Sequence, residues 1–397
     1  MKLTLLCYAG YVCCGTVPLI AMEPTWIGQA NNAFAIDLFA KLAAEKGENL
    51  FFSPASIETA LAMTYAGARG RTAGQMAKVL HLPSANEAIH KDFGDFLKEL
   101  NGAGGKRSYE LSVANALWGQ KGYAFLPDFR NLLKSEYDAR LDEVDFKGNS
   151  EGARKTINAW VEKQTRDKIK DLIGPRMLTP LTRLVLTNAI YFKGTWSTPF
   201  DKTATSDQTF HFSGGADKKV PMMQRTGRYD YMEGVDFQAL RLKYAGNKLA
   251  MIILLPRSVD GLAQIERELT PEWLSDSFGK LRSQQVIISM PRFRMEKQYE
   301  LTPTLEAMGM QAAFTDADFS GMTGNKDLAI SNVIHKAFVE VNEEGTEAAA
   351  ATGVVMSRMA LPQSQPPVFR ADHPFVFVIR DEESGAFLFM GRLMKPN

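Results

Sequence analysis

The 397-residue chain has a net charge of +1, with 45% hydrophobic and 23% charged residues. This balance predicts a soluble globular protein, and it argues against nucleic-acid binding and against a strongly charged surface partner. The length would ordinarily indicate two or more domains, yet no linker, internal repeat or low-complexity tract interrupts residues 26–341.

Residues 1–21 form a mostly apolar stretch behind Lys2 and before the first acidic residue, Glu23. This pattern predicts a signal peptide cleaved after Ala21, and hence a secreted, extracellular or periplasmic protein. Met22 offers an alternative start, and a chain that began there would lack the leader and stay in the cytoplasm. The stretch lacks the clean run of about 20 apolar residues that a membrane anchor needs, so we expect no membrane partner.

All three cysteines lie in this leader, so the mature chain offers neither disulfides nor a cysteine-based metal site. No two histidines stand at ligand spacing, and we therefore expect no metal and no cofactor. The five histidines are His81, His90, His211, His335 and His373.

Helical patterns are frequent in the first half of the chain. Apolar residues recur at helical spacing between Asn31 and Lys46. Ser53 and Pro54 suit the first turn of a second helix, which stops at Gly67. Further helices are predicted over 83–105, 151–173 and 301–310.

Strand patterns are frequent in the second half. They combine apolar, β-branched and aromatic residues in short runs. The predicted strands cover 184–196, 237–242, 249–255, 286–293 and 334–342, with the carboxyl-terminal strands over 369–379 and 387–392.

A run of very small residues follows the strand over 334–342. Because alanine is the best helix former, residues 348–351 predict a helical turn or a linker. The run also fits a strand, since residues 346–356 taken with period two give one uncharged face that is small at its leading end. Small side chains can slide between packed strands where bulky ones would clash. Prolines within 361–367 end any regular structure beyond it.

The sequence Glu-Glu-Gly-Thr-Glu-Ala-Ala-Ala-Ala-Thr at 343–352 resembles the reactive-loop hinge of inhibitory serpins. Residues 49–75, 184–196 and 369–379 also fit the family, and the resemblance extends from about Trp26 to Pro396. It implies an α+β serpin fold with three β-sheets, a large mixed central sheet and eight to nine helices. It also implies one domain over 22–397, with an exposed reactive-centre loop at about 343–367.

The resemblance implies a suicide-substrate inhibitor of serine proteases, and not an enzyme. The cleaved loop would insert residues 346–358 as a central strand and hold the protease in a covalent complex with a monomeric inhibitor. The implied hinge consists of Glu344, Gly345, Thr346, Glu347, Ala348, Ala349, Ala350, Ala351 and Thr352.

Counting along the loop predicts the scissile bond. In the commonest loop length of the family, the residue before the cut lies fourteen residues after the hinge glycine, which gives Met359-Ala360. Methionine favours chymotrypsin-, elastase- or subtilisin-like targets, whose pockets take a flexible apolar side chain. A shorter loop would place the cut at Arg358-Met359 and suit trypsin-like enzymes.

Two further features are assigned through the resemblance. Ser53, Ser56, Asn188 and His335 match the polar cluster called the shutter, whose groups can each donate and accept hydrogen bonds. Trp196 matches the breach, where the loop enters the sheet. Without the resemblance, a lone buried histidine is usually structural and a buried tryptophan usually belongs to the core.

Two other functions compete with inhibition. Non-inhibitory carriers or chaperones share the fold, but they typically have bulky, charged or proline residues in the hinge. A serine hydrolase is suggested only by the Ser-x-x-Lys pattern from Ser277 to Lys280, which occurs by chance in a chain this long and lacks its Lys-Thr-Gly partner.

Overall fold

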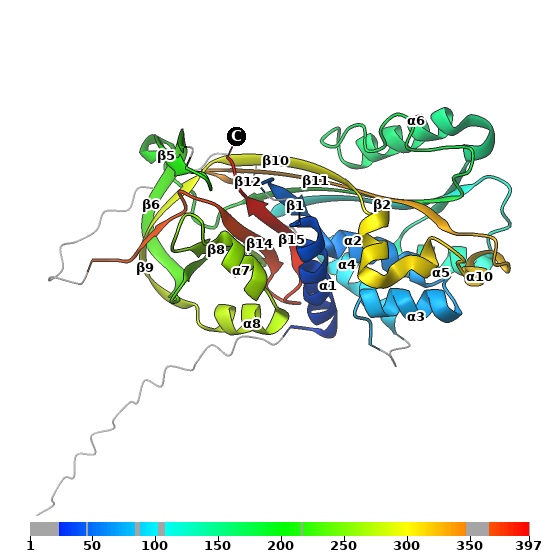
Figure 1. Ribbon diagram of the computed structural model, residues 1–397, viewed down its shortest axis with the longest axis horizontal. Helices are drawn as coiled ribbons and strands as arrows, with labels where there is room; N and C mark the ends of the chain where they lie inside the picture. Colours follow the sequence, from blue (N-terminus) through cyan, green and yellow to red (C-terminus); the bar gives the residue numbers. More distant parts are fainter. Residues whose placement is uncertain are drawn as a thin grey trace, which may run out of the picture.

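A computed structural model describes residues 24–44, 47–83, 88–101, 108–215, 217–346 and 365–396 (Figure 1). The predicted signal peptide at 1–21 lies outside these residues. None of the described helices combines the length and the apolar character needed to cross a membrane.

Capping residues set the starts of the first two helices. The Thr25 hydroxyl accepts a hydrogen bond from the Gly28 amide, and Ser53 caps the next helix just before Pro54. Eight of the described helices have seven residues or more, as predicted, and two are single turns. They are α1 (Trp26–Leu42), α2 (Pro54–Tyr65), α3 (Gly70–Val79), α4 (Ile89–Leu100), α5 (Pro127–Tyr137), α6 (Phe146–Gln164), α7 (Leu262–Glu268), α8 (Pro271–Gly279), α9 (Thr302–Leu305) and α10 (Ser320–Thr323).

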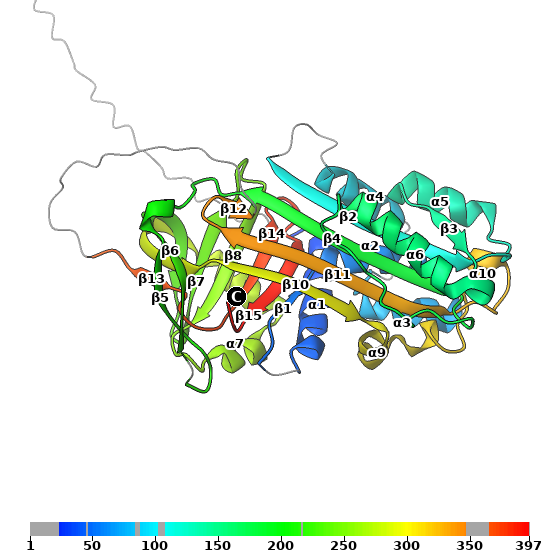
Figure 2. The ribbon, with the colours of Figure 1, turned by 90° about the horizontal axis from the view of Figure 1, so that it is seen from above.

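The long strands of Figure 2 form a six-stranded mixed sheet. The pairs β11–β4 and β2–β3 are parallel, and the others are antiparallel. The prediction of an α+β fold with a large mixed central sheet is therefore confirmed. Its order is β10 (Phe293–Glu300), β11 (Ile330–Asn342), β12 (Gly345–Thr346), β4 (Leu184–Thr195), β2 (Tyr109–Gln120) and β3 (Leu141–Val144).

The remaining described strands form one hydrogen-bonded network, although the resemblance implied two further sheets. The long strand β6 joins them, because its beginning pairs with β5 and its end pairs with β7. The order is β1 (Leu50–Phe52), β15 (Phe387–Leu393), β14 (Phe375–Asp381), β8 (Leu249–Pro256), β7 (Phe237–Lys243), β6 (Asp217–Glu233), β9 (Arg282–Pro291) and β13 (Val368–Arg370), with β5 (Ser206–His211) on β6.

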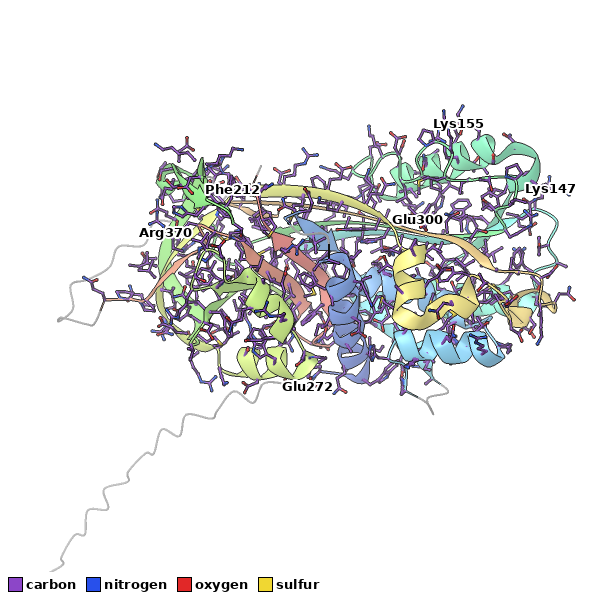
Figure 3. The ribbon with its side chains drawn as sticks, in the orientation of Figure 1. Lys147, Lys155, Phe212, Glu272, Glu300 and Arg370 are labelled. Carbon is purple, nitrogen blue, oxygen red and sulfur yellow. The ribbon has the colours of Figure 1, made fainter. Side chains whose placement is uncertain are left out.

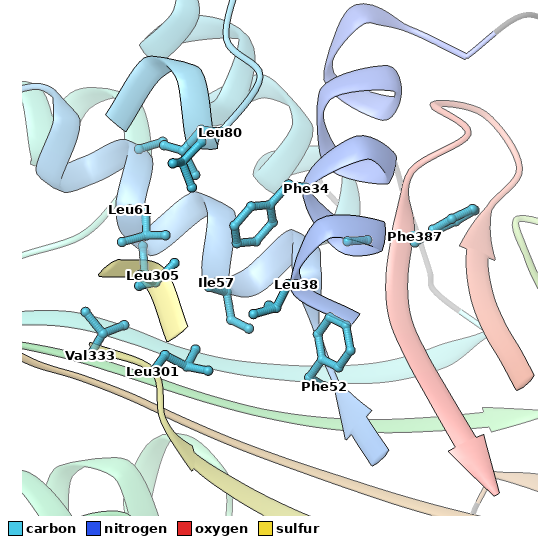
Figure 4. Packing of buried hydrophobic residues seen from close by; sticks show 14 of the residues in the cluster. Phe34, Leu38, Phe52, Ile57, Leu61, Leu80, Leu301, Leu305, Val333 and Phe387 are labelled. Carbon is cyan, nitrogen blue, oxygen red and sulfur yellow. The ribbon is translucent and has the colours of Figure 1, made fainter. Parts of the chain in front are cut away.

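Apolar side chains pack on both faces of the central sheet. Figure 4 shows one cluster, in which Phe34 and Leu38 of α1 and Leu61 of α2 lie near Val333 of β11. On the opposite face, Ile157 and Val161 of α6 are buried against β2, β4 and β11. Burial on both faces fixes the strand register, since a one-residue slip would exchange the two faces.

Helix α6 ends earlier than its apolar pattern suggested. It stops at Gln164 instead of continuing to Ile173, because Arg166 and Asp167 have positive φ angles of 50° and 59°, and the Ile169 amide donates to the Thr165 hydroxyl instead of to a helical carbonyl. Residues 165–173 then run as an irregular segment whose apolar side chains stay buried. Lys155 lies on the outer side of α6, away from the sheet, and Lys147 is exposed at the end of the molecule (Figure 3).

Candidate functional site

The seam between β4 and β11 is the central feature of the six-stranded sheet. The two strands pair in parallel from Ile330–Leu184 to Phe338–Tyr191. Beyond Phe338 and Tyr191, toward the carboxyl ends of both strands, they separate. There β12 lies between them, antiparallel to both (Figure 2). The backbone of Thr346 stands opposite both Val341 and Gly194. The first residues of the predicted hinge therefore already occupy the start of a strand position between β11 and β4.

Gly345 fits this position because it has no side chain. Its φ of 142° is rare for other residues, and a Cβ there would lie 2.0 Å from the Gly194 carbonyl oxygen. The contact is with backbone on a central strand, so no rotamer change can relieve it. Glycine is thus required where the chain enters the seam.

Two buried carboxylates hold the base of the hinge. Glu343 accepts hydrogen bonds from Arg292, with Nε at 2.7 Å, and from the Thr205 hydroxyl. Burial acts to raise the pKa of Glu343, but these hydrogen bonds outweigh it and leave the pKa below its usual value. Glu344 forms an ion pair with the more exposed Lys202. These contacts tie the hinge to Arg292 between β9 and β10 and to the segment after β4.

Trp196 lies at the top of the seam, where the resemblance puts the breach. Its indole Nε1 donates to the Asn342 carbonyl at 3.0 Å, and its amide donates to the Glu344 carbonyl at 2.8 Å. The ring stacks on Tyr244, with centroids 4.6 Å apart. The Phe200 amide also donates to the Glu343 carbonyl at 2.8 Å. The segment 196–200 therefore holds the backbone just before the hinge.

The structure brings all four predicted shutter residues together beneath the seam. The Ser53 amide donates to His335 Nε2 at 3.1 Å, and the Ser53 hydroxyl donates to the Leu388 carbonyl at 2.6 Å. Asn188 Nδ2 donates to the Ser56 hydroxyl at 2.5 Å. His335 Nδ1 bonds to the Asn188 side-chain oxygen directly across the parallel pair. Strand separation along the seam would break this last bond.

Asn115 belongs to the same cluster but was not predicted. Its side-chain oxygen on β2 accepts hydrogen bonds from the Ser56 hydroxyl, at 3.1 Å, and from Asn188. An asparagine in a strand with alternating polar and apolar residues is an ordinary polar residue, so the sequence did not indicate that Asn115 belongs to the cluster. The cluster thus extends across three strands and the first turn of α2.

His335 is neutral in this arrangement. Burial lowers its pKa to about 3. Because Nε2 accepts the Ser53 amide, the ring proton lies on Nδ1 and is donated to Asn188. The imidazole therefore acts as a connector between strands and not as an acid or base at neutral pH.

Several predicted residues lie outside the described part of the chain. These are Glu347, Ala348, Ala349, Ala350, Ala351 and Thr352 of the hinge, and Arg358, Met359 and Ala360 at the reactive bond. Within the described residues, no group of three or more histidine, cysteine or acidic side chains could hold a metal ion.

The sequence matches the family described as Serpin (serine protease inhibitor) over residues 29–396. The chain belongs to the serpin family. Its serpin identity confirms the prediction that it is a protease-inhibitor type of protein and not an enzyme. In agreement, Lys280 of the Ser-x-x-Lys pattern pairs with Asp276 at 2.5 Å, while Ser277 is buried.

Human leukocyte elastase inhibitor is 43% identical to this serpin over 382 residues, which cover 93% of this chain and 99% of the relative. The structure is similar to uncleaved ovalbumin, with a TM-score of 0.84 and 32% identity over 93% of this chain and 100% of the other. It is also similar to human thyroxine-binding globulin complexed with thyroxine, with a TM-score of 0.84 and 30% identity. The match covers 94% of this chain and 98% of the other.

Proposed function

We propose that this serpin is a suicide-substrate inhibitor of serine proteases that traps its target by inserting residues 346–358 between β11 and β4. The observation that carries the proposal is the position of β12, which already lies in the seam and pairs with both strands. An inserting loop would extend an existing strand and would not have to nucleate a new one.

The register of β12 supports the proposed length of the insert. If β12 continued in the same register toward the amino-terminal ends of β4 and β11, residue 356 would lie opposite Leu184 and residue 357 opposite Ile330. Leu184 and Ile330 are the first residues of β4 and β11. Insertion would thus use the whole length of both strands and carry Met359 just past the end of the sheet.

Trapping depends on two competing rates. The protease serine attacks the Met359 carbonyl carbon, the bond to Ala360 breaks, and the new amine of Ala360 takes the proton. Insertion must then displace the ester-linked protease before water hydrolyses the ester. Replacing one parallel pair by two antiparallel pairs adds roughly ten backbone hydrogen bonds, each worth on the order of 0.5–1.5 kcal/mol net. This gain can exceed the cost of deforming the protease.

Two features of the structure oppose premature insertion. The bond between His335 and Asn188 links the strands that must part. The segment after α6 is tied over the sheet, because Lys336 Nζ donates to the Lys170 carbonyl at 2.7 Å and Gln298 donates to the Leu172 carbonyl at 3.0 Å. Insertion requires the first bond to break and this segment to move.

The target class follows from the residue before the cut. Met359 favours chymotrypsin-, elastase- or subtilisin-like proteases, and the similarity to leukocyte elastase inhibitor supports this class. A cut at Arg358-Met359 would instead direct the inhibitor to trypsin-like proteases. Both versions use the same insertion mechanism.

A carrier function is the alternative, and one observation favours it. A cavity of about 660 Å³ lies between α1 and α8, with Leu274, Phe278 and Phe387 among its lining residues and Arg380 at its side. The similarity to thyroxine-binding globulin is consistent with such a role. An inhibitory hinge is not needed for a carrier, so the small residues at 346–352 favour inhibition.

Incubation with chymotrypsin, elastase, subtilisin and trypsin tests the proposal. An inhibitor gives a protease complex that survives boiling in detergent, and a carrier is merely cut in its loop. Peptide sequencing of the released fragment identifies the scissile bond. Cleavage by all four proteases without any stable complex would contradict the proposal.

We also propose that the protein is exported through removal of residues 1–21. The support is the apolar leader, which contains every cysteine of the chain. Amino-terminal sequencing of protein purified from its natural source tests this. A mature chain that starts at Met22 without processing would indicate a cytoplasmic protein.

A further inference from the structure

Strands β6 and β7 separate close to the breach. They are paired from Glu233–Gln238 to Asp230–Arg241. The next two residues, Tyr229 on β6 and Leu242 on β7, are not paired with each other. A cavity of about 130 Å³ lies in this fork, and Trp196 and Phe200 line it from the segment after β4. Because a water molecule takes up about 30 Å³ in the liquid, the cavity has room for several waters or one small anion.

Two hydrogen-bond donors at this cavity are buried without a partner. The Tyr229 hydroxyl and the Arg241 Nε each lie away from solvent, and no described residue accepts a hydrogen bond from either. Burial raises the pKa of Tyr229, so its hydroxyl keeps its proton at neutral pH. Buried donors are seldom left unsatisfied, since each costs free energy comparable to a lost hydrogen bond. Glu382, whose Oε2 lies 3.4 Å from Arg241, likewise keeps one buried oxygen, Oε1, without a partner among the described residues. The Tyr229 hydroxyl and Arg241 Nε therefore still lack an acceptor in the fork.

Positive charge predominates around the fork. Arg228, Arg241 and Lys243 line the cavity, whereas Asp230 is the acidic residue among its lining side chains. The ion pairs are loose: Arg241 Nη1 lies 3.7 Å from Asp230 and 3.4 Å from Glu382, and Lys243 lies 3.5 Å from Asp230. Arg380 approaches Arg241 as a further like charge. Arg228 donates to the Ser283 carbonyl at 3.2 Å. Four cations thus face three carboxylates, because Asp381 also lies close to Arg380.

We propose that the fork between β6 and β7 binds a small oxyanion, with Arg241 Nε and the Tyr229 hydroxyl as its hydrogen-bond donors. Oxyanions accept several hydrogen bonds at once and are favoured by net positive charge. The cavity volume suits inorganic phosphate, sulfate or a compact carboxylate.

An anion in the fork would act on the breach. Trp196 and Phe200 line the cavity, and the same two residues donate their amides to the backbone before the hinge. A ligand that binds this arrangement more tightly than the loop-inserted form stabilises the uncleaved form by mass action. Occupation of the fork should therefore slow loop insertion, a consequence that rests on the proposed inhibitory function.

Titration calorimetry of the full chain tests the site with inorganic phosphate, sulfate and acetate, against chloride at matched ionic strength. We expect saturable binding that Tyr229→Phe weakens on the order of tenfold, since one hydrogen bond to a charged group is lost. Arg241→Lys should weaken it similarly, because lysine keeps the charge but lacks Nε. Phosphate and sulfate binding without acetate binding identifies a tetrahedral anion, and binding of all three identifies a general oxyanion site.

Tyr231→Phe is the matched control. Tyr231 lies two residues along the same strand, and its hydroxyl already accepts Gln238 Nε2 at 2.8 Å. It should bind phosphate like the wild type. The proposal is overturned if the heats with phosphate, sulfate and acetate equal those with chloride, or if Tyr229→Phe binds as tightly as Tyr231→Phe.

The proposed effect of anion binding on the breach is tested by two further measurements. Phosphate should raise the melting temperature of the uncleaved protein and lower its rate of complex formation, in the wild type but not in Tyr229→Phe. Bound phosphate without any change in either quantity would overturn the coupling and leave the binding site intact. Absence of complexes at any phosphate concentration would overturn the inhibitory function alone, because calorimetry does not depend on it.

Discussion

His335 on β11 and Asn188 on β4 are register partners in the parallel pair at the centre of the sheet, and their side chains are hydrogen-bonded. The bond crosses the line along which a new strand would enter. The imidazole is fully buried, and the resulting loss of solvation lowers its pKa to about 3. The hydrogen bond between the two strands is therefore linked to pH through His335.

Acid should destabilise the uncleaved protein through His335. Its pKa is lower in the folded state than the ordinary 6.5, so the unfolded chain binds the proton more tightly. The stabilisation is fully present above pH 6.5 and is lost as pH falls toward 3, by about 2 kcal/mol between pH 7 and pH 5. Urea unfolding at these pH values should show a smaller loss in His335→Gln. An equal loss in both proteins would exclude His335 as the source.

Glu58 should give the opposite pH dependence. Burial raises its pKa to about 8, Asn31 donates to one carboxyl oxygen at 3.0 Å, and the other oxygen has no partner among the described residues. The folded state binds the proton more tightly, so its stabilisation is present below pH 4.5 and is lost as pH rises through 8. Glu58→Gln should therefore raise the free energy of unfolding by up to about 3 kcal/mol at pH 7. The gain should vanish near pH 4.5, and a pH-independent difference would contradict it.

The fold follows closely from local sequence patterns, and the site does so only in part. The alternation over 334–342 and the apolar run over 184–196 correspond to β11 and β4. In contrast, Glu343 and Arg292 lie 51 positions apart, and nothing local to either residue indicates their contact. Such contacts arise from the packing of distant elements.

The sequence pattern also did not predict where α6 ends. The apolar pattern of 151–173 continues past Gln164, yet the backbone leaves the helix there through the positive φ angles of Arg166 and Asp167. The buried apolar residues beyond it keep the pattern without the helix. Periodicity reports which side chains are buried, and it does not report where the backbone leaves the helix.

Loss of the Glu343 carboxylate should loosen the hinge. Glu343 is buried and bonded to Arg292 and Thr205. Glu343→Gln removes the charge from this pair and should lower the free energy of unfolding of the uncleaved protein by about 2 kcal/mol. It should also accelerate uptake of a synthetic peptide with the sequence of residues 346–358, followed by native gel mobility. Lys134→Ala, which removes an exposed ion pair with Asp138 far from the hinge in the sequence, serves as the control.

The reactive bond can be assigned by exchanging its side chains. If the cut is at Met359-Ala360, Met359→Arg should abolish inhibition of chymotrypsin and elastase and create inhibition of trypsin. Arg358→Ala should leave chymotrypsin and elastase inhibition within a few-fold of the wild type. Association rates with each protease measure both effects. Retained elastase inhibition in Met359→Arg, together with loss of trypsin inhibition in Arg358→Ala, would assign the cut to Arg358-Met359.

A charge at position 346 should convert the inhibitor into a substrate. The backbone of Thr346 is the last described pairing of β12, so insertion must extend the strand from this position. Burying an unpaired arginine there costs on the order of several kcal/mol, which slows insertion while ester hydrolysis continues. Thr346→Arg should therefore be cut at the same bond without forming stable complexes, whereas Thr346→Ser should still inhibit. Cleavage should raise the melting temperature sharply in the wild type and less in Thr346→Arg. An unchanged melting temperature after wild-type cleavage would show that insertion does not occur, and the carrier function would then be favoured.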